Sequence, residues 1–180
     1  MREKRAKEIM TDELHFLTRE DHAPVVLYIT NENLEFQGDA VYEKVKQMTG
    51  IPFDFCELPV ANWDNCLTPW AADVQMKGRS FTGGGKQLLE MVGKNVIPLI
   101  DEKLPDHREI YIAGYSLAGL FSLWTLYACD WFDGAVCCSG SLWYPGWSQY
   151  IEQTFLQKKS DVYLSLGKKE PHTKHPLMKK

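Results

Sequence analysis

Short apolar runs alternate with amphipathic helical patterns along most of the chain, and this alternation limits the fold more than any other feature. The apolar runs predict strands at residues 24–30, 53–60, 109–113, 133–138 and 161–166. Helical patterns between them cover residues 39–48, 86–103, 117–129 and 146–157. Pro98 should kink the second helix or divide it in two. Strands that alternate with helices predict an α/β fold, with a mostly parallel sheet covered by helices on both faces.

The composition fits one globular domain that spans residues 1–180. The 180 residues are 44% hydrophobic, which is enough to build one core, and we place that core at about residues 24–170. A net charge of −4 leaves no basic excess to neutralise a phosphate backbone, so nucleic acid is not an expected partner. Residues 171–180 form a basic tail, which is either simply solvated or binds anions.

Neither a membrane segment nor a metal site is predicted. No apolar run approaches the roughly 18 residues of a membrane span, and the charged first residues lead into no apolar segment typical of a secretory signal. The five Cys are an odd set without a C-x-x-C pair. We therefore expect free thiols, no zinc site and a reducing, cytoplasmic location.

The most informative motif joins the predicted strand 109–113 to the predicted helix 117–129 and reads Gly-Tyr-Ser-Leu-Ala-Gly at residues 114–119. It is nearly the Gly-x-Ser-x-Gly nucleophile elbow, in which small residues let a strand reverse into a helix and leave the serine hydroxyl projecting above the sheet. Ser116 is therefore the candidate nucleophile. The backbone N–H of Leu117, at the helix N-terminus, is a candidate oxyanion donor. The alternative is a plain strand–turn–helix connection whose glycines only permit tight packing.

Four other short segments accompany this motif: Trp-Asp at residues 63–64, Leu-Thr-Pro-Trp at 67–70, Gly-Gly-Gly at 83–85 and Cys-Ser-Gly-Ser-Leu-Trp-Tyr at 138–144. In this combination the sequence resembles the esterase D / enterochelin-esterase-like branch of the α/β-hydrolases over about residues 24–170. The resemblance implies an α/β-hydrolase-like three-layer sandwich with a mostly parallel sheet. It also implies hydrolysis of a small-molecule carboxylic ester through an acyl-serine intermediate, without a metal or an organic cofactor.

The resemblance further implies roles for individual residues. Members of the family order the catalytic triad as Ser, acid and His along the chain. With Ser116 as the nucleophile, Glu170 is the candidate acid, because it follows the last predicted strand; the alternative is an ordinary surface charge. The second oxyanion donor is expected to be a backbone N–H just after the strand 24–30, at Thr30 or Asn31.

Four residues are candidates for substrate binding: Trp63, Trp70, Ser141 and Trp143. They follow predicted strands, on the side where α/β folds bind ligands, and two of them belong to the long stretch 62–81, which has no clean period. The tryptophans either line an acyl or aromatic pocket or close the loops structurally. Ser141 ends the strand that follows the nucleophile helix and is a candidate to support the nucleophile.

The resemblance fails at the C-terminus. The family's catalytic His follows one more strand, and this sequence ends at Lys180 without such a segment. His172 and His175 follow Glu170 and either reach the site or belong to an exposed tail. Because a serine without a base is a weak nucleophile, we expect a C-terminally truncated fold with impaired hydrolase activity. The alternative is a catalytically silent module that binds a ligand or a partner.

The predicted strand 161–166 should then lie at an edge of the sheet. No further strand follows it in the sequence, so its apolar side chains would be left without cover. We therefore expect a homodimer that forms through this edge, or poor solubility.

Overall fold

The computed structural model describes residues 14–17, 22–32, 38–74, 76, 79–168 and 170. The predicted basic tail 171–180, with His172 and His175, lies outside the described residues. The elements of the main sheet and its helices are β1 (His15–Phe16), β2 (Val25–Asn31), α2 (Gly38–Thr49), β3 (Asp54–Val60), α4 (Gly85–Met91), α5 (Ile97–Lys103), β6 (Ile110–Tyr115), α6 (Leu117–Ala128), β7 (Gly134–Cys138), α7 (Trp147–Gln153) and β8 (Asp161–Ser165).

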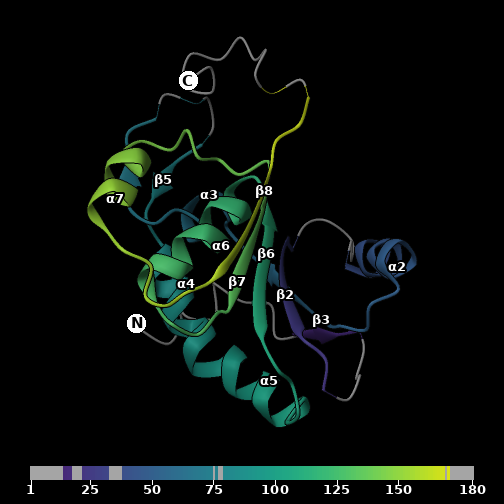
Figure 1. The fold of residues 1–180 in the computed structure, drawn as a ribbon. Coiled ribbons are helices and arrows are strands. Elements are labelled where there is room, and N and C mark those ends of the chain that lie inside the picture. Colours follow the sequence, from purple (N-terminus) through teal and green to yellow (C-terminus); the bar gives the residue numbers. More distant parts are fainter. Residues whose placement is uncertain are drawn as a thin grey trace.

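Within the described residues, six strands form one sheet in the order β1-β3-β2-β6-β7-β8. The pairs from β3 to β8 are all parallel, and only the short β1 runs antiparallel to its neighbour β3. Helix α2 covers one face, whereas α4, α5, α6 and α7 lie on the other side of the sheet (Figure 1). This arrangement confirms the predicted mostly parallel sheet with helices on both sides.

The core lies between the sheet and α6. Alternate residues of the central strand β2 (Val25, Leu27 and Ile29) are at most 1% exposed on this side. Every residue of α6 from Leu117 to Leu126 is buried, because this helix is apolar on all sides. The opposite side of the sheet packs a smaller cluster of Tyr42, Phe53 and Phe55 beneath α2. Helix α6 is thus anchored in the core along ten consecutive residues.

The long predicted helix runs without a break over residues 85–103, and a π-helical segment lies directly before Pro98, where the sequence predicted a kink or a division. Between α4 and α5 lies a π-helical turn, Val92–Val96, in which the N–H of Ile97 reaches back to the carbonyl of Val92. Pro98 then occupies the first turn of α5. Since proline has no N–H and its ring crowds the preceding turn, the wider π-turn accommodates it without a chain break.

The stretch 62–81, predicted to be a loop, contains short regular elements. These are helix α3 (Trp63–Cys66) and a two-stranded antiparallel sheet of β4 (Ala71–Ala72) and β5 (Phe81–Thr82). Each is too short to show a hydrophobic period, and the same holds for β1, which the sequence did not predict.

Alkaline pH should destabilise this fold through its cysteines. Burial raises the pKa of Cys66 and Cys137 from 9.0 to about 11. Unfolding therefore releases thiol protons between about pH 9 and 11, and the free energy of unfolding should fall by roughly 1 kcal/mol per pH unit for each such thiol. Urea unfolding under reducing conditions at pH 8.5 and 10.5 measures this fall. Cys137→Ala should make it smaller, whereas Val136→Ala on the same strand should not; equal falls would contradict the assignment.

Candidate active site

Ser116 forms the entire turn between β6 and α6. The strand ends at Tyr115, the helix begins at Leu117, and the serine between them has φ 59° and ψ −117°. A residue with a side chain rarely adopts such angles, so the backbone of Ser116 is strained. Three backbone hydrogen bonds hold it: Ser116 N–H donates to the carbonyl of Cys138 (3.0 Å), and its own carbonyl accepts from Leu120 (3.1 Å) and Ser141 (2.9 Å).

The glycine two residues before Ser116 gives the turn its space. A Cβ on Gly114 would lie 2.5 Å from the backbone carbon of Ala118 and 2.6 Å from its Cβ, so no larger residue fits at position 114. Ala118 stands where the usual elbow motif has its last glycine, and its methyl group is fully buried in the space that Gly114 leaves. The replacement of that glycine by alanine is therefore compatible with the tight turn.

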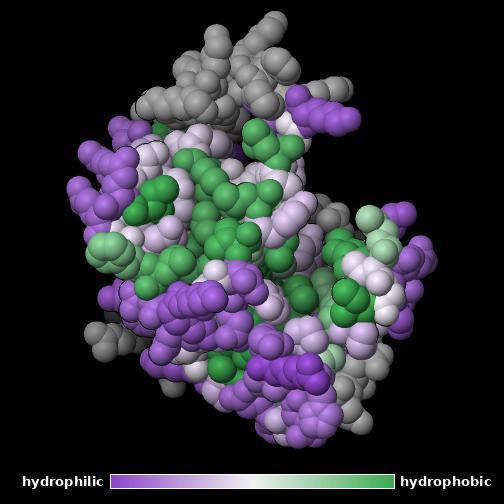
Figure 2. Space-filling model, in the orientation of Figure 1, coloured by the Kyte–Doolittle hydropathy of each residue, from purple (hydrophilic) through white to green (hydrophobic). Residues whose placement is uncertain are grey.

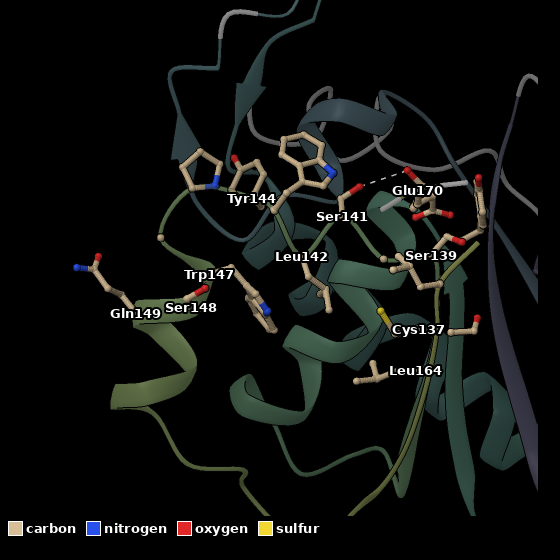
Figure 3. Close-up of a pocket in the computed structure, with 18 of the residues that line it drawn as sticks. Cys137, Ser139, Ser141, Leu142, Tyr144, Trp147, Ser148, Gln149, Leu164 and Glu170 are labelled. Carbon is tan, nitrogen blue, oxygen red and sulfur yellow. Dashed lines mark hydrogen bonds between the residues drawn. The ribbon is translucent and has the colours of Figure 1, made fainter. Parts of the chain in front are cut away.

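Ser116 opens into a pocket of about 960 Å³. Four of the residues predicted from the sequence line it together: Ser116, Ser141, Trp143 and Glu170. Further lining residues include Arg79, Tyr115, Ser139, Leu142, Trp147, Leu164 and Leu166 (Figure 3). The pocket is thus bounded by the elbow, by the segment between β7 and α7, and by the end of β8.

The segment after β7 supports the serine directly. Ser141 is 3% exposed, its N–H bonds the Ser116 carbonyl, and its hydroxyl lies 3.3 Å from the Ser116 hydroxyl. The dashed line in Figure 3 marks this last contact. Ser139 has a positive φ of 46°, which bends the segment back over the elbow. Ser141 can therefore fix the rotamer of the Ser116 side chain.

Glu170 borders the pocket on the side of β8. Its Oε1 accepts a hydrogen bond from the N–H of Gly167 at 3.1 Å, which holds the side chain back toward the end of the strand. Figure 3 shows it on the same side of the pocket as Ser139.

None of the histidines that the structure describes lines this pocket. They are His15, His22 and His107. His107 precedes β6 and its Nε2 pairs with Asp101 at 2.8 Å, at the end of the sheet opposite to Ser116. The described part of the chain therefore contributes a serine and a carboxylate to the pocket, without an imidazole.

The predicted oxyanion donors are backbone groups near the elbow. Leu117 is the first residue of α6, where N–H groups have no acceptor within the helix. Strand β2 pairs with β6 up to Ile29 and Gly114, so its last residues, Thr30 and Asn31, continue toward the level of the elbow. Thr30 is buried and Asn31 pairs with Val60 of β3; neither lines the pocket.

Trp70 does not line the pocket but holds the segment Tyr144–Pro145, which does, by two hydrogen bonds. Its Nε1 donates to the carbonyl of Pro145 at 2.8 Å, and Tyr144 Oη donates back to the carbonyl of Trp70 at 2.6 Å. Trp63 is half-buried and packs against the main core. Trp143 does line the pocket and packs edge-on against Phe81, with ring centroids 6.5 Å apart.

Sequence reasoning missed Arg79, which is the one basic side chain among the described residues that line the pocket. Its Nε donates to Asp64 Oδ2 at 2.8 Å, a second contact joins Nη2 to Oδ1, and its guanidinium lies 5.1 Å from the ring of Phe81. The hydrogen bond to Asp64 raises the pKa of Arg79 above its ordinary value. Only the neighbouring Asp64, in the Trp-Asp pair at residues 63–64, was part of a recognised segment.

The described residues contain neither a cluster of metal-binding side chains nor a helix that could span a membrane. Among residues 14–170, apart from the gaps given above, no three His, Cys, Asp or Glu side chains gather closely enough to hold a metal ion. Over the same ranges no helix combines the length and the apolar character needed to cross a membrane.

No protein-family model and no curated protein matches the chain. Solved structures do. The siderophore hydrolase EstA from Aspergillus nidulans superposes with a TM-score of 0.65 at 15% identity, over 91% of this chain and 69% of EstA. An IroE-like serine hydrolase from Shewanella oneidensis gives 0.63 at 21% identity over 74% of this chain. The BES protein from Bacillus cereus gives 0.63 at 20% identity over 86% of this chain.

These similarities establish the fold, which is α/β-hydrolase-like. They do not extend to the full length of the matched proteins, since the chain spans 46% of the Shewanella structure and 70% of the Bacillus structure.

Replacing Gly114 by a residue with a side chain should destabilise the turn at Ser116 and with it the fold. Because its Cβ would meet the backbone of Ala118, Gly114→Ala should lower the free energy of unfolding by about 2 kcal/mol or more. Ala118→Gly, which restores the usual motif, should cost about 1 kcal/mol, the ordinary penalty for glycine in a helix. Urea unfolding of the two variants tests this order. A Gly114→Ala protein as stable as the Ala118→Gly protein would contradict the packing described.

Proposed function

We propose that this chain is a serine hydrolase that cleaves carboxylic esters through an acyl-enzyme at Ser116. One observation carries the proposal: a serine in a strained turn (φ 59°, ψ −117°), at the start of a buried helix, opens into a pocket of about 960 Å³. A strained residue persists only where the surrounding structure holds it, and such residues gather at active sites. A turn that served packing alone would have no need to expose a hydroxyl in this way.

The chemistry follows from the groups around that hydroxyl. Ser116 Oγ attacks the ester carbonyl and its proton passes to a base; the C–O bond then breaks, the alcohol leaves, and water releases the acid from the serine. The N–H of Leu117, at the positive end of the α6 dipole, stabilises the developing oxyanion. We propose an N–H of Thr30 or Asn31 as the second donor, because β2 ends beside the elbow. Glu170 would orient the base.

The lining of the pocket indicates the kind of substrate. Its volume lies within the usual range for small-molecule sites, roughly 300–1,000 Å³. Apolar walls of Leu142, Trp143 and Trp147 suit an acyl or aromatic group, and the ion pair of Arg79 with Asp64 makes the border polar. Two of the structural matches are named siderophore hydrolases, from the same fungus, so siderophore esters are the first natural substrates to assay.

We propose that turnover is impaired. The base must come from outside the pocket residues described, since none of them is a histidine. Loss of one triad member commonly leaves a rate of on the order of 10³–10⁴ over water, supplied by the oxyanion hole and by binding.

The five free cysteines, three of them buried, support a reducing cytoplasmic location.

The absence of a described histidine from the pocket also favours a second candidate, a catalytically silent module that binds an ester-like ligand in the same pocket. The two candidates differ in one property only. The enzyme forms a covalent bond through Ser116, whereas the module binds without one.

A fluorophosphonate probe separates the two candidates. Mass spectrometry should find one adduct per chain, located on Ser116, and Ser116→Ala should abolish it. Ser122→Ala is the matched control, because Ser122 lies on α6, directly after the turn at Ser116, but is buried and donates a hydrogen bond to the Ala118 carbonyl. No adduct at high probe excess, in a protein whose thermal unfolding is cooperative, would rule out the hydrolase.

The hydroxyl of Ser141 should increase the rate at which the fluorophosphonate probe labels Ser116. Removing one neutral hydrogen bond costs about 1 kcal/mol, so Ser141→Ala should slow labelling about fivefold. Ser148→Ala, at a pocket residue of α7, should leave the rate within about twofold of the parent. Equal rates for both variants and the parent would show that Ser141 does not position the nucleophile.

A further inference from the structure

Strand β8 leaves one row of backbone groups without a partner among the described residues. Asp161 N–H donates to the Asp133 carbonyl (2.9 Å), and the Ser165 carbonyl accepts from Ser139 N–H (2.8 Å), so residues 161, 163 and 165 turn their backbone groups toward β7. In a strand the residues between them must turn the other way. Val162, Leu164 and Leu166 therefore direct their N–H and C=O groups out from the edge of the sheet.

The side chains of this edge are apolar and exposed. Val162, Tyr163, Leu164 and Leu166 are 43%, 57%, 55% and 62% exposed. Figure 2 shows apolar side chains gathered over β8 and beside α7. Edge strands are usually protected by charges, prolines or bulges, whereas Asp161 is the one charged residue of β8. The composition of β8 is therefore typical of a strand that pairs with a neighbour on both of its sides.

We propose that two copies of this chain associate through β8, with the two strands antiparallel about a two-fold axis at Leu164. When two identical sheets join edge to edge, the two-fold axis runs perpendicular to the plane of the joined sheet. The face of one sheet that carries α6 therefore continues into the same face of the partner's sheet. Residues that meet must then belong to the same face. The pairing joins the six-stranded sheets that the structure describes in each copy into one continuous sheet.

The sequence of the edge selects this register. With the axis at Leu164, Leu164 faces itself and Val162 faces Leu166, and these are the residues whose backbone groups point outward. On the other face Tyr163 meets Ser165, and Asp161 meets Gly167, so no charge opposes a like charge. With the axis at Tyr163 instead, Leu166 would face the polar Ser160, and its apolar side chain would remain uncovered.

The pairing also reaches the pocket. Leu164, Ser165 and Leu166 line the pocket while they form the edge, and Gly167, which holds the Glu170 carboxylate, follows directly. A partner strand on this edge would immobilise one wall of the site. The proposal itself does not depend on hydrolase activity.

The oligomeric state tests the association. Sedimentation equilibrium of the full chain should give twice the 20.7 kDa of one copy. Leu164→Glu, which places two carboxylates at the axis, should give monomers. Met48→Glu is the matched control, because Met48 is 74% exposed on α2, remote from β8. A monomeric parent protein at high concentration, or a dimer that survives Leu164→Glu, would overturn the proposal.

Single cysteines test the register. Residues directly opposite in an antiparallel hydrogen-bonded pair have Cα atoms about 5.5 Å apart, within the reach of a disulfide, whereas a shift of two residues separates them by roughly 7–8 Å. Leu164→Cys should therefore form a disulfide-linked dimer under mild oxidation, and Tyr163→Cys should not. The reverse result, or equal crosslinking of both variants and of the parent, would overturn the register.

Discussion

The reversal of the backbone at Ser116 is the constraint on which the site depends. An unfavourable conformation of this kind costs about 1–3 kcal/mol and persists only where its surroundings hold it. Here the hydrogen bonds come from three segments: Cys138 at the end of β7, Leu120 in α6 and Ser141 beyond β7. Each of these segments is itself held by the core, because α6 is buried against β6 and β7. Ser116 is thus positioned by the same packing that stabilises the sheet.

The sequence predicted the sheet and the elbow because both leave strong local patterns. Parallel strands buried on both faces read as uninterrupted apolar runs, so β2 was predicted almost to its ends. The elbow was predictable because a one-residue reversal requires small neighbours, and Gly114 has no room for a Cβ. The irregularity of the helix near Pro98 followed from the missing N–H of proline, although the sequence carried no signal for the π-turn that accommodates it.

What could not be predicted depends on contacts between distant segments. Arg79 joins the lining of the pocket because its guanidinium pairs with Asp64, fifteen residues earlier, and no periodicity encodes that pairing. Trp70 was predicted either to line the pocket or to close a loop, and only its hydrogen bond to Pro145 distinguishes the two. Strands of two residues, such as β1 and β4, are shorter than any repeat a sequence can display.

The two hydrogen bonds between Trp70 and the segment Tyr144–Pro145 join parts of the chain 74 and 75 residues apart. One of these parts carries Trp143 and the apolar wall of the pocket, and the other belongs to the irregular stretch before α4. Insertions or exchanges in that earlier stretch would therefore widen or narrow the cavity without touching the elbow. The shape of the cavity and the turn at Ser116 are thus held by different contacts, so an exchange near Trp70 can alter the cavity while the hydrogen bonds around Ser116 stay in place.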